Sequence, residues 1–174
     1  MSTPAADPAE TPVEGRHGPL AGERWTYELV RTQRVPRPLD EVFAFFAEAR
    51  NLERLTPPWL SFRIVDAPAE LTAGATIDYR LRLVGMPVRW TSEIAQWAPP
   101  TAFSDVQLRG PYARWEHTHR FSAVGDHTDA EDRVVYRPPG GPLAPLVRTA
   151  LVRSQLERIF AYRAEQISEI FSAG

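Results

Sequence analysis

The segment that most constrains this chain is 113–121, where two kinds of side chain alternate without a break. One set of alternate positions holds large, mostly aromatic side chains: Trp115, His117, His119 and Phe121. The other set holds charged and polar ones: Arg114, Glu116, Thr118 and Arg120. Because successive strand side chains point to opposite faces, the segment predicts a strand with one solvated face and one apolar face. Two imidazoles on the apolar face indicate a buried polar network or the wall of a cavity.

Composition narrows the possible chemistry. The chain has 174 residues, enough for one domain with a sizeable core. It has no cysteine, which excludes disulfides, zinc–thiolate sites and thiol nucleophiles, and no lysine, which excludes a lysine Schiff base. The net charge of −2 offers no electrostatic case for nucleic acid or for an anionic membrane. Without a run of about 18 apolar residues or a secretory leader, we expect a cytoplasmic protein with no integral membrane association.

The order of elements follows from apolar period and turn residues. We expect a disordered tail over residues 1–22, with His17 solvated in it, and a single domain over 23–174. A strand over 26–35 precedes two short helices, one opened by Pro38 and one over 51–55. Further strands are predicted at 61–66, 76–84, 88–97, 103–108, 113–124 and in a segment ending at Arg137, with two-residue turns at 85–86 and 125–126. An amphipathic helix is predicted over 146–171.

This order predicts an α+β fold of the helix-grip type. A curved antiparallel sheet of about seven strands wraps around a long C-terminal helix, and two short helices follow the first strand. The helix should pack on the concave face through its apolar stripe: Val152, Leu156, Ile159, Phe160 and Ile167. Arginines of the opposite parity should lie on the convex face in exposed ion pairs: Arg80, Arg82, Arg114 and Arg120.

Several separated motifs, in this order, resemble the SRPBCC superfamily, which includes START lipid-transfer domains, birch-pollen-allergen-like proteins and polyketide cyclase/dehydrase proteins. The resemblance covers about residues 24–172 and is closest to the small bacterial ligand-binding branch. The motifs that carry it are the segments 51–58, 90–94, 103–107, 110–112, 115–119, 132–136 and 159–163. The resemblance implies a cavity between sheet and helix, and it is compatible with binding, transport or cyclisation, because one fold hosts many functions.

Turn positions predict which inward side chains face each other. A loop at 125–126 sets His119 opposite Asp132, and a turn centred on Pro111 sets Asp105 opposite His117. A two-residue loop at 99–100 sets Asp105 opposite Ile94. We expect the Asp132 carboxylate to raise the pKa of His119 against the opposing effect of burial.

Four interpretations of the two histidines stay open: paired polar groups in a core, donors in a ligand cavity, acid–base catalysts, or metal ligands. Tyr112, in a Gly-Pro-Tyr turn, is expected to pack on the sheet edge rather than contact a ligand. The candidate acid–base residues are His117, His119, Asp105 and Asp132. The candidate ligand-binding residues are Tyr79, Trp90, Ser92, Gln107, Trp115, His117, His119, Tyr136, Leu156 and Phe160.

The leading functional hypothesis is the binding of a small hydrophobic molecule in a cavity of several hundred Å³, as is typical of small-molecule sites. Candidates are a lipid, an isoprenoid quinone or a polyketide-like aromatic compound. One alternative is a cyclase/dehydratase enzyme using His/Asp acid–base chemistry, and another is a protein-interaction module. We expect no cofactor and no metal, and the oligomeric state is left open.

Overall fold

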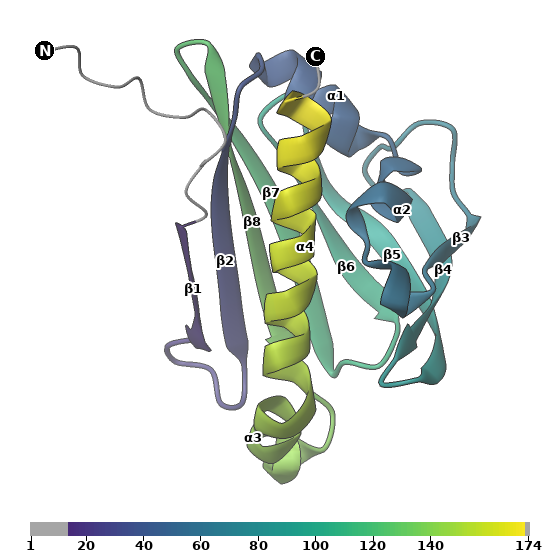
Figure 1. Ribbon diagram of the computed structural model, residues 1–174. Helices are drawn as coiled ribbons and strands as arrows, with labels where there is room; N and C mark the ends of the chain where they lie inside the picture. The colour runs from purple at the N-terminus through teal and green to yellow at the C-terminus, as the bar shows by residue number, and fades with distance from the viewer. Residues whose placement is uncertain (1–13, 173–174) are drawn as a thin grey trace, which may run out of the picture.

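The computed structural model describes residues 14–172 as an antiparallel sheet with helices on its concave side (Figure 1). The eight strands lie in the order β1-β2-β8-β7-β6-β5-β4-β3. Their bounds are β1 Glu14–Pro19, β2 Tyr27–Val35, β3 Arg63–Asp66, β4 Thr76–Leu83, β5 Met86–Ala98, β6 Ala102–Arg109, β7 Arg114–Val124 and β8 His127–Arg137. Between β2 and β3 lie α1 (Leu39–Ala47), α2 (Asn51–Leu55) and the 3-10 turn η1 (Pro58–Leu60). The helix-grip prediction is confirmed, with one strand more than expected.

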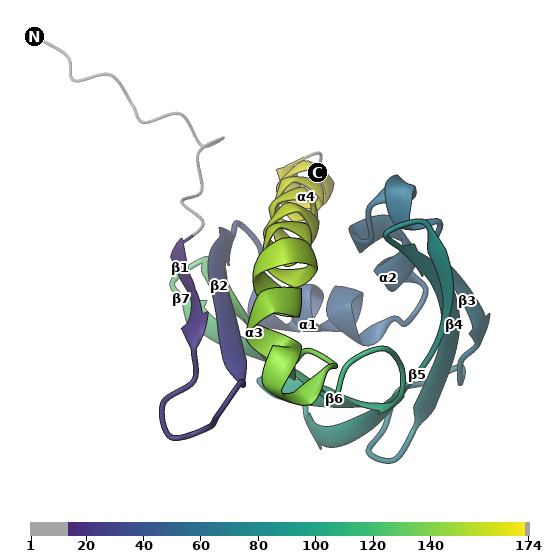
Figure 2. The same ribbon diagram turned by 90° about the horizontal axis from the view of Figure 1, so that it is seen from below.

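The C-terminal helical segment follows β8 and lies across the concave face. After the 3-10 turn η2 (Gly141–Leu143) it continues through α3 (Ala144–Val147), one π-helical stretch η3 (Arg148–Val152) and α4 (Arg153–Ser172). It begins slightly before the predicted 146–171 and widens at η3, where the Thr149 hydroxyl donates to the Pro145 carbonyl (3.0 Å). Such back-bonding bends helices. Seen from below, the sheet curves around α4, α1 and α2 (Figure 2).

The segment 14–19 corrects the predicted tail, because it forms β1 and pairs with β2, His17 opposite Leu29. Residues 1–13 lie outside the described residues. The His17 side chain is buried, not solvated: Nε2 lies 2.6 Å from the Tyr136 hydroxyl and Nδ1 lies 2.7 Å from Glu157 Oε1. Burial lowers its pKa, although Glu157 acts in the opposite direction. This strand was not predicted because it is short and has one large inward side chain, so its sequence shows no alternation of apolar and polar residues.

Turn geometry sets the register at the site. The predicted turn at 125–126 is confirmed, since Val124 pairs with His127 and His119 with Asp132. The β4–β5 turn lies one residue earlier than the predicted 85–86. It is formed by Val84 and Gly85, because Leu83 pairs with Met86. Both turn residues have positive φ (51° and 79°). That combination is typical of the type I′ turn that two-residue hairpins favour.

The faces of the sheet follow the predicted parity. Val152, Leu156, Phe160 and Ile167 are buried against the concave side, and Ile159 is half-buried. Arginine side chains lie on the convex side: Arg80, Arg82 and Arg120 are exposed and Arg114 is half-buried. Arg114 pairs with Glu23 and Glu116, and Arg120 with Glu131. Within residues 14–172, Arg80 and Arg82 make no ion pair, which corrects that part of the expectation.

Candidate functional site

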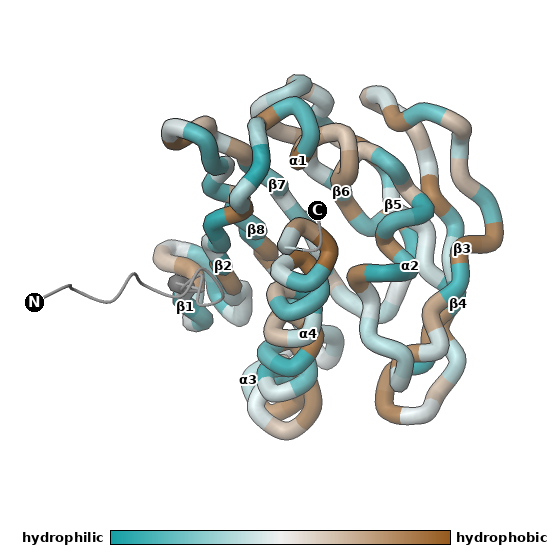
Figure 3. The backbone as a smooth tube through the Cα atoms, turned by 45° about the horizontal axis from the view of Figure 1, so that its top comes forward, coloured by the Kyte–Doolittle hydropathy of each residue, from teal (hydrophilic) through white to brown (hydrophobic). Residues whose placement is uncertain are grey.

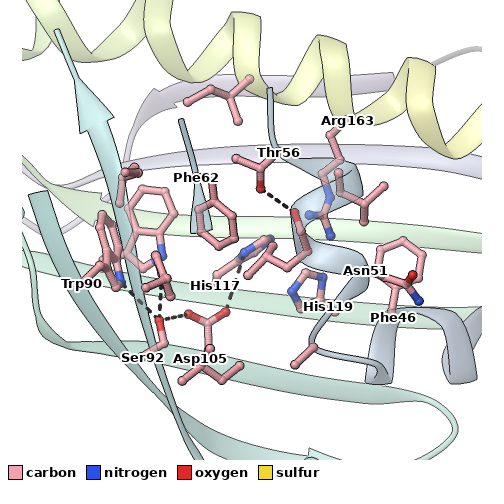
Figure 4. Close-up of a pocket in the computed structure, with 18 of the residues that line it drawn as sticks. Phe46, Asn51, Thr56, Phe62, Trp90, Ser92, Asp105, His117, His119 and Arg163 are labelled. Carbon is pink, nitrogen blue, oxygen red and sulfur yellow. Dashed lines mark hydrogen bonds and ion pairs between the residues drawn. The ribbon is translucent and has the colours of Figure 1, made fainter. Parts of the chain in front are cut away.

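A cavity of about 180 Å³ lies between the concave sheet face, the α1–α2–η1 segment and α4 (Figure 4). Most of its wall is apolar or aromatic. The helical side contributes Phe45, Phe46, Leu52, Leu55, Leu60, Leu156, Ile159 and Phe160, and the sheet side contributes Ile77, Leu81, Leu83, Ile94 and Phe103. The cavity is smaller than the several hundred Å³ expected from the sequence.

Aromatic rings form the wall on the β4–β5 side. Tyr79 stacks on Trp90 with ring centres 5.8 Å apart, and Trp90 meets Trp115 edge-on at 5.3 Å. Tyr112 packs on Trp115 at 4.9 Å and lines the cavity, which corrects its assignment to the sheet edge. Gln107 holds Tyr112 in place: its side-chain amide donates to the Tyr112 carbonyl (2.8 Å) and accepts from the Tyr112 N–H (3.2 Å).

Ser92 and Asp105 begin a polar row along the cavity floor. The Ser92 hydroxyl donates to Asp105 Oδ2 (3.0 Å) and accepts from the indole N–H of Trp90 (3.1 Å). The Tyr79 hydroxyl lies 3.2 Å from Ser92 Oγ. Burial raises the pKa of Asp105 despite the opposing influence of His117 and Ser92, and burial also raises the pKa of Tyr79 well above its usual range. Asp105 is therefore a carboxyl group that holds its proton more tightly than an exposed aspartate.

His117 lies between two carboxyl groups. Its Nε2 is 2.9 Å from Asp132 Oδ1, and its Nδ1 is 3.8 Å from Asp105 Oδ1. Because the Asp132 carboxylate carries no proton near neutral pH, the proton of the shorter contact belongs to Nε2. In the neutral ring, Nδ1 then has a free lone pair beside Asp105, at the wall of the cavity.

Asp132 is the centre of the network, behind the cavity wall. Besides His117, it accepts a hydrogen bond from Arg163 Nε (3.0 Å) on α4. Burial acts to raise the pKa of Asp132, but Arg163, His119 and His117 together hold it well below its usual range. The Arg163 guanidinium also lies over the Phe46 ring at 5.3 Å. The buried carboxylate is thus neutralised by a cation that reaches it from the opposite layer of the fold.

His119 is the least satisfied member of the network. Its Nδ1 lies 2.7 Å from Asp132 Oδ1, so the predicted contact is present. The angle is not that of a hydrogen bond, and Nδ1 has no hydrogen-bond partner among residues 14–172. Burial, aided by His117, lowers the pKa of His119 to about 3, although Asp132 acts in the opposite direction. Asp132 raises this pKa and burial lowers it, as expected, and the net pKa is low because desolvation outweighs the carboxylate.

The same residues include a set of metal donors. Asp105, His117 and His119 offer ligand atoms that all lie within 4.8 Å of one another. Two imidazoles and one carboxylate are ligands that iron or zinc accepts. Separately, no helix in the described part of the chain is long and apolar enough to cross a membrane.

Comparison with known proteins identifies the family of this chain. The family described as polyketide cyclase / dehydrase and lipid transport matches residues 26–169. The chain belongs to this family. It lies within the SRPBCC superfamily, so the resemblance read from the sequence motifs is confirmed. No protein of curated function matches the chain.

Solved structures agree with the family's fold. Protein Ms6760 from Mycobacterium smegmatis is 19% identical with a TM-score of 0.64, and covers 93% of this chain and 99% of its own. Protein TTHA0849 from Thermus thermophilus is 21% identical with a TM-score of 0.63, covering 84% and 97%. The Zhui aromatase/cyclase from a Streptomyces species is 16% identical with a TM-score of 0.67, covering 84% and 94%. At these identities the likeness shows the fold.

Within this polyketide cyclase/dehydrase fold, most of the predicted site residues line the cavity: Tyr79, Trp90, Ser92, Asp105, Trp115, His117, His119, Leu156 and Phe160. Gln107 and Tyr136 lie outside its wall. Gln107 braces Tyr112, while the Tyr136 hydroxyl contacts His17 and accepts from Arg148 Nε (3.3 Å).

Arg163 was the main omission, although the sequence carries a signal for it. It falls on the buried stripe of α4 together with Leu156, Phe160, Ile167 and Phe171. An arginine at such a position needs a buried anion, because an unpaired charge is not tolerated there. Asn51 and Thr56, at α2, and Phe62, directly before β3, also line the cavity without having been predicted (Figure 4).

Proposed function

We propose that this is a cytoplasmic binding protein for a compact, mostly aromatic molecule that carries a hydroxyl or carbonyl group. The fold of the family encloses a hydrophobic ligand-binding cavity, and the finer choice rests on the volume and the polar row. About 180 Å³ is less than the roughly 300–1,000 Å³ of sites for drug-sized ligands. It favours a compact polyketide-like aromatic over a diacyl lipid or a long isoprenoid chain.

The observation that carries the proposal is the position of Asp105 and His117 at one end of an otherwise apolar cavity. In the neutral ring, His117 Nδ1 accepts a hydrogen bond from a ligand hydroxyl, and the protonated form of Asp105 donates to a ligand carbonyl. The stacked Tyr79 and Trp90 supply flat surfaces for an aromatic ring. Polar groups at one end and rings along the side are the usual means of fixing a ligand's orientation.

Two probes test this arrangement: 1-naphthol and naphthalene, which differ by one hydroxyl. Quenching of Trp90 and Trp115 fluorescence reports occupancy. We expect 1-naphthol to bind about fivefold more tightly, the worth of one hydrogen bond of about 1 kcal/mol. His117→Phe should remove that preference while leaving naphthalene binding in place, and His127→Phe, in the exposed β7–β8 turn, is the control. Equal affinity of the wild-type protein for both probes, or no binding of either, would reject the proposal.

A cyclase/dehydratase activity is the second candidate, favoured by the orientation of His117. Asp132 accepts from Nε2 (2.9 Å), which leaves Nδ1 as a base at the cavity wall, the arrangement by which a carboxylate orients a catalytic imidazole. With a β-hydroxy ketone, Nδ1 takes the α proton and Asp105 protonates the departing hydroxyl. Water leaves, and the proton on His117 returns to Asp105, 3.8 Å away.

The cyclase/dehydratase activity can be tested separately. Dehydration of a β-hydroxy aryl ketone should be lost in His117→Gln, while binding of naphthalene to the same variant stays within about twofold, because the apolar walls are unchanged. Retained turnover in His117→Gln excludes this mechanism. Binding without turnover in the wild-type protein leaves a binding protein only.

A further inference from the structure

One end of the molecule has no acidic residue in three of its connecting segments. In an antiparallel sheet, the β4–β5 hairpin, the β6–β7 turn and the segment that leaves β8 for α3 come to the same end, here called the α3 end (Figure 1). The chain has no aspartate or glutamate between Asp78 and Glu93, between Asp105 and Glu116, or between Asp132 and Glu157. The same stretches contain arginines: Arg80, Arg82, Arg89, Arg109, Arg114, Arg133, Arg137, Arg148 and Arg153. The α3 end is therefore basic, although the net charge of the whole chain is −2.

Several of these arginines are exposed and have no counter-charge. Arg82, Arg89, Arg109 and Arg153 make no ion pair within residues 14–172. The β1–β2 connection brings Glu23 to this end, but Arg114 binds it at 2.6 Å.

Like charges also stand side by side on the convex face near this end. Arg63 on β3 pairs with Arg80 on β4, and Arg80 pairs with Arg89 on β5. All three are exposed. Like charges directly opposite one another destabilise a sheet, so a row of three is best accommodated where an external anion neutralises it.

Large apolar side chains protrude at or next to the same three connections, the last of which continues into α3 and η3. They are Val84, Met86, Leu108, Leu143, Leu146 and Leu151, each between 48% and 67% exposed. Figure 3 shows brown, hydrophobic segments at α3 and at the tip of the β4–β5 hairpin. Val84 and Leu151 line one surface groove with Trp59 and Leu60, and Leu60 also belongs to the cavity wall. Apolar tips and basic side chains thus share one end, next to the candidate site.

We propose that the α3 end docks onto a bilayer that contains anionic lipids. The protruding tips enter the boundary between headgroups and acyl chains, and the unpaired arginines bind lipid phosphates, as in other interfacial proteins. The tips come from three separate connections and project outward, so they suit a deformable surface better than one matching protein partner. The attachment is peripheral, and it stands whether or not the proposed ligand is correct.

Vesicle sedimentation tests the docking directly. The full chain is mixed with vesicles of phosphatidylcholine alone, or of phosphatidylcholine with phosphatidylglycerol, at low and at high salt. We expect binding to the mixed vesicles only, and weaker binding at high salt because exposed charges are screened. Arg153→Gln should lower the affinity about fivefold, the effect of one arginine near an anionic surface. The control is Arg120→Gln, an exposed arginine on β7 that pairs with Glu131 away from these connections.

An apolar pair of variants separates insertion from simple charge attraction. Leu146→Glu should lower vesicle affinity at least about tenfold, since it removes an apolar tip and adds a repelled charge. Val124→Glu makes the same kind of change at the exposed β7–β8 turn, at the opposite end of the sheet, and should have little effect. Circular dichroism confirms that each variant is folded.

Three results would overturn the proposal. The first is no binding of the wild-type chain to the mixed vesicles. The second is an equal effect of Leu146→Glu and Val124→Glu. The third is binding of soluble polyglutamate as tightly as of the mixed vesicles, with no loss in Leu146→Glu, which would identify an acidic polypeptide as the partner.

Discussion

Acid should weaken this fold through His119. The imidazole is buried, its Nδ1 has no hydrogen-bond partner among the described residues, and burial lowers its pKa from 6.5 to about 3. The unfolded chain has no such environment, so its imidazole keeps a pKa near 6.5. The folded and unfolded states therefore bind different numbers of protons between pH 6.5 and about 3.

The sign and size follow from that difference. Above pH 6.5 neither state binds the proton, and His119 contributes no pH dependence. Below it, only the unfolded state is protonated, so the free energy of unfolding falls by about 1.4 kcal/mol per pH unit. At about pH 4.5 the accumulated loss is about 3 kcal/mol, and below about pH 3 His119 adds no more. Asp132, whose pKa is lowered, contributes stability that is present above its unfolded pKa of about 4 and is lost as pH falls from there through its folded pKa. Its effect therefore begins below about pH 4 and overlaps only the lowest part of the His119 range.

Urea unfolding, followed by tryptophan fluorescence, measures the effect from about pH 7.5 down to about 4.5. The comparison is between the wild-type protein and His119→Asn, whose amide does not titrate. The gap in unfolding free energy between the two should change by about 3 kcal/mol across this range, in favour of the variant at low pH. His17 titrates in both proteins and cancels, and His127→Asn, in an exposed turn, should track the wild type. Parallel pH curves for the wild-type protein and His119→Asn would refute the reasoning, because burial would then not hold the imidazole neutral.

Two further changes probe the frame of the site. Arg163→Met leaves the Asp132 carboxylate buried without its cation, so it should lower the free energy of unfolding by about 3–5 kcal/mol. Adding Asp132→Asn should restore much of the loss. Urea midpoints at pH 7 measure both effects, and a double variant no more stable than the single one contradicts the pairing. Gly110→Ala places a Cβ 2.3 Å from Gln107 Oε1 and should lower the free energy of unfolding by about 1–3 kcal/mol in the same assay. Gly18→Ala, with nothing within 4 Å of its Cβ, should be nearly neutral. Equal effects of the two variants would show that the Gln107–Tyr112 hydrogen bonds do not contribute to stability.

The fold could be predicted wherever a side-chain period met a well-defined turn. Seven strands, the two short helices and the long helix follow from alternation, from prolines and from apolar stripes. The turn at 125–126 alone fixes which residues of β7 and β8 face each other, because a one-residue slip would exchange the buried and exposed faces. β1 could not be found this way, since its main inward contact is a single polar side chain, His17.

The site was only partly predictable, because parity places a side chain on a face and no further. Tyr136 is inward as expected, yet its hydroxyl is taken by His17 and Arg148. Gln107 is turned to the Tyr112 backbone by a local hydrogen-bond pair that periodicity does not encode. Arg163 comes from a distant helix, and its partner becomes visible only when the layers are packed together.

The polar row depends on a compensation between a loop and a bulge. The loop between β5 and β6 has three residues instead of the predicted two, since Ala98 pairs with Ala102. Left uncorrected, this shift would move Asp105 away from its partners. Ala95 is an unpaired extra residue between Ile94 and Gln96, and it restores the pairing of Ile94 with Asp105.

The bulge also changes which side chains face inward beyond it. Parity places Gln96 on the inner face, but Gln96 is exposed, and Trp97 packs instead against Phe43 and Phe103. One inserted residue thus allows an apolar tryptophan at one end of β5 and the Ser92–Asp105 hydrogen bond in its middle to face the same interior. A regular strand of the same sequence would satisfy one of these and expose the other. The bulge is therefore part of what positions the carboxyl group beside His117.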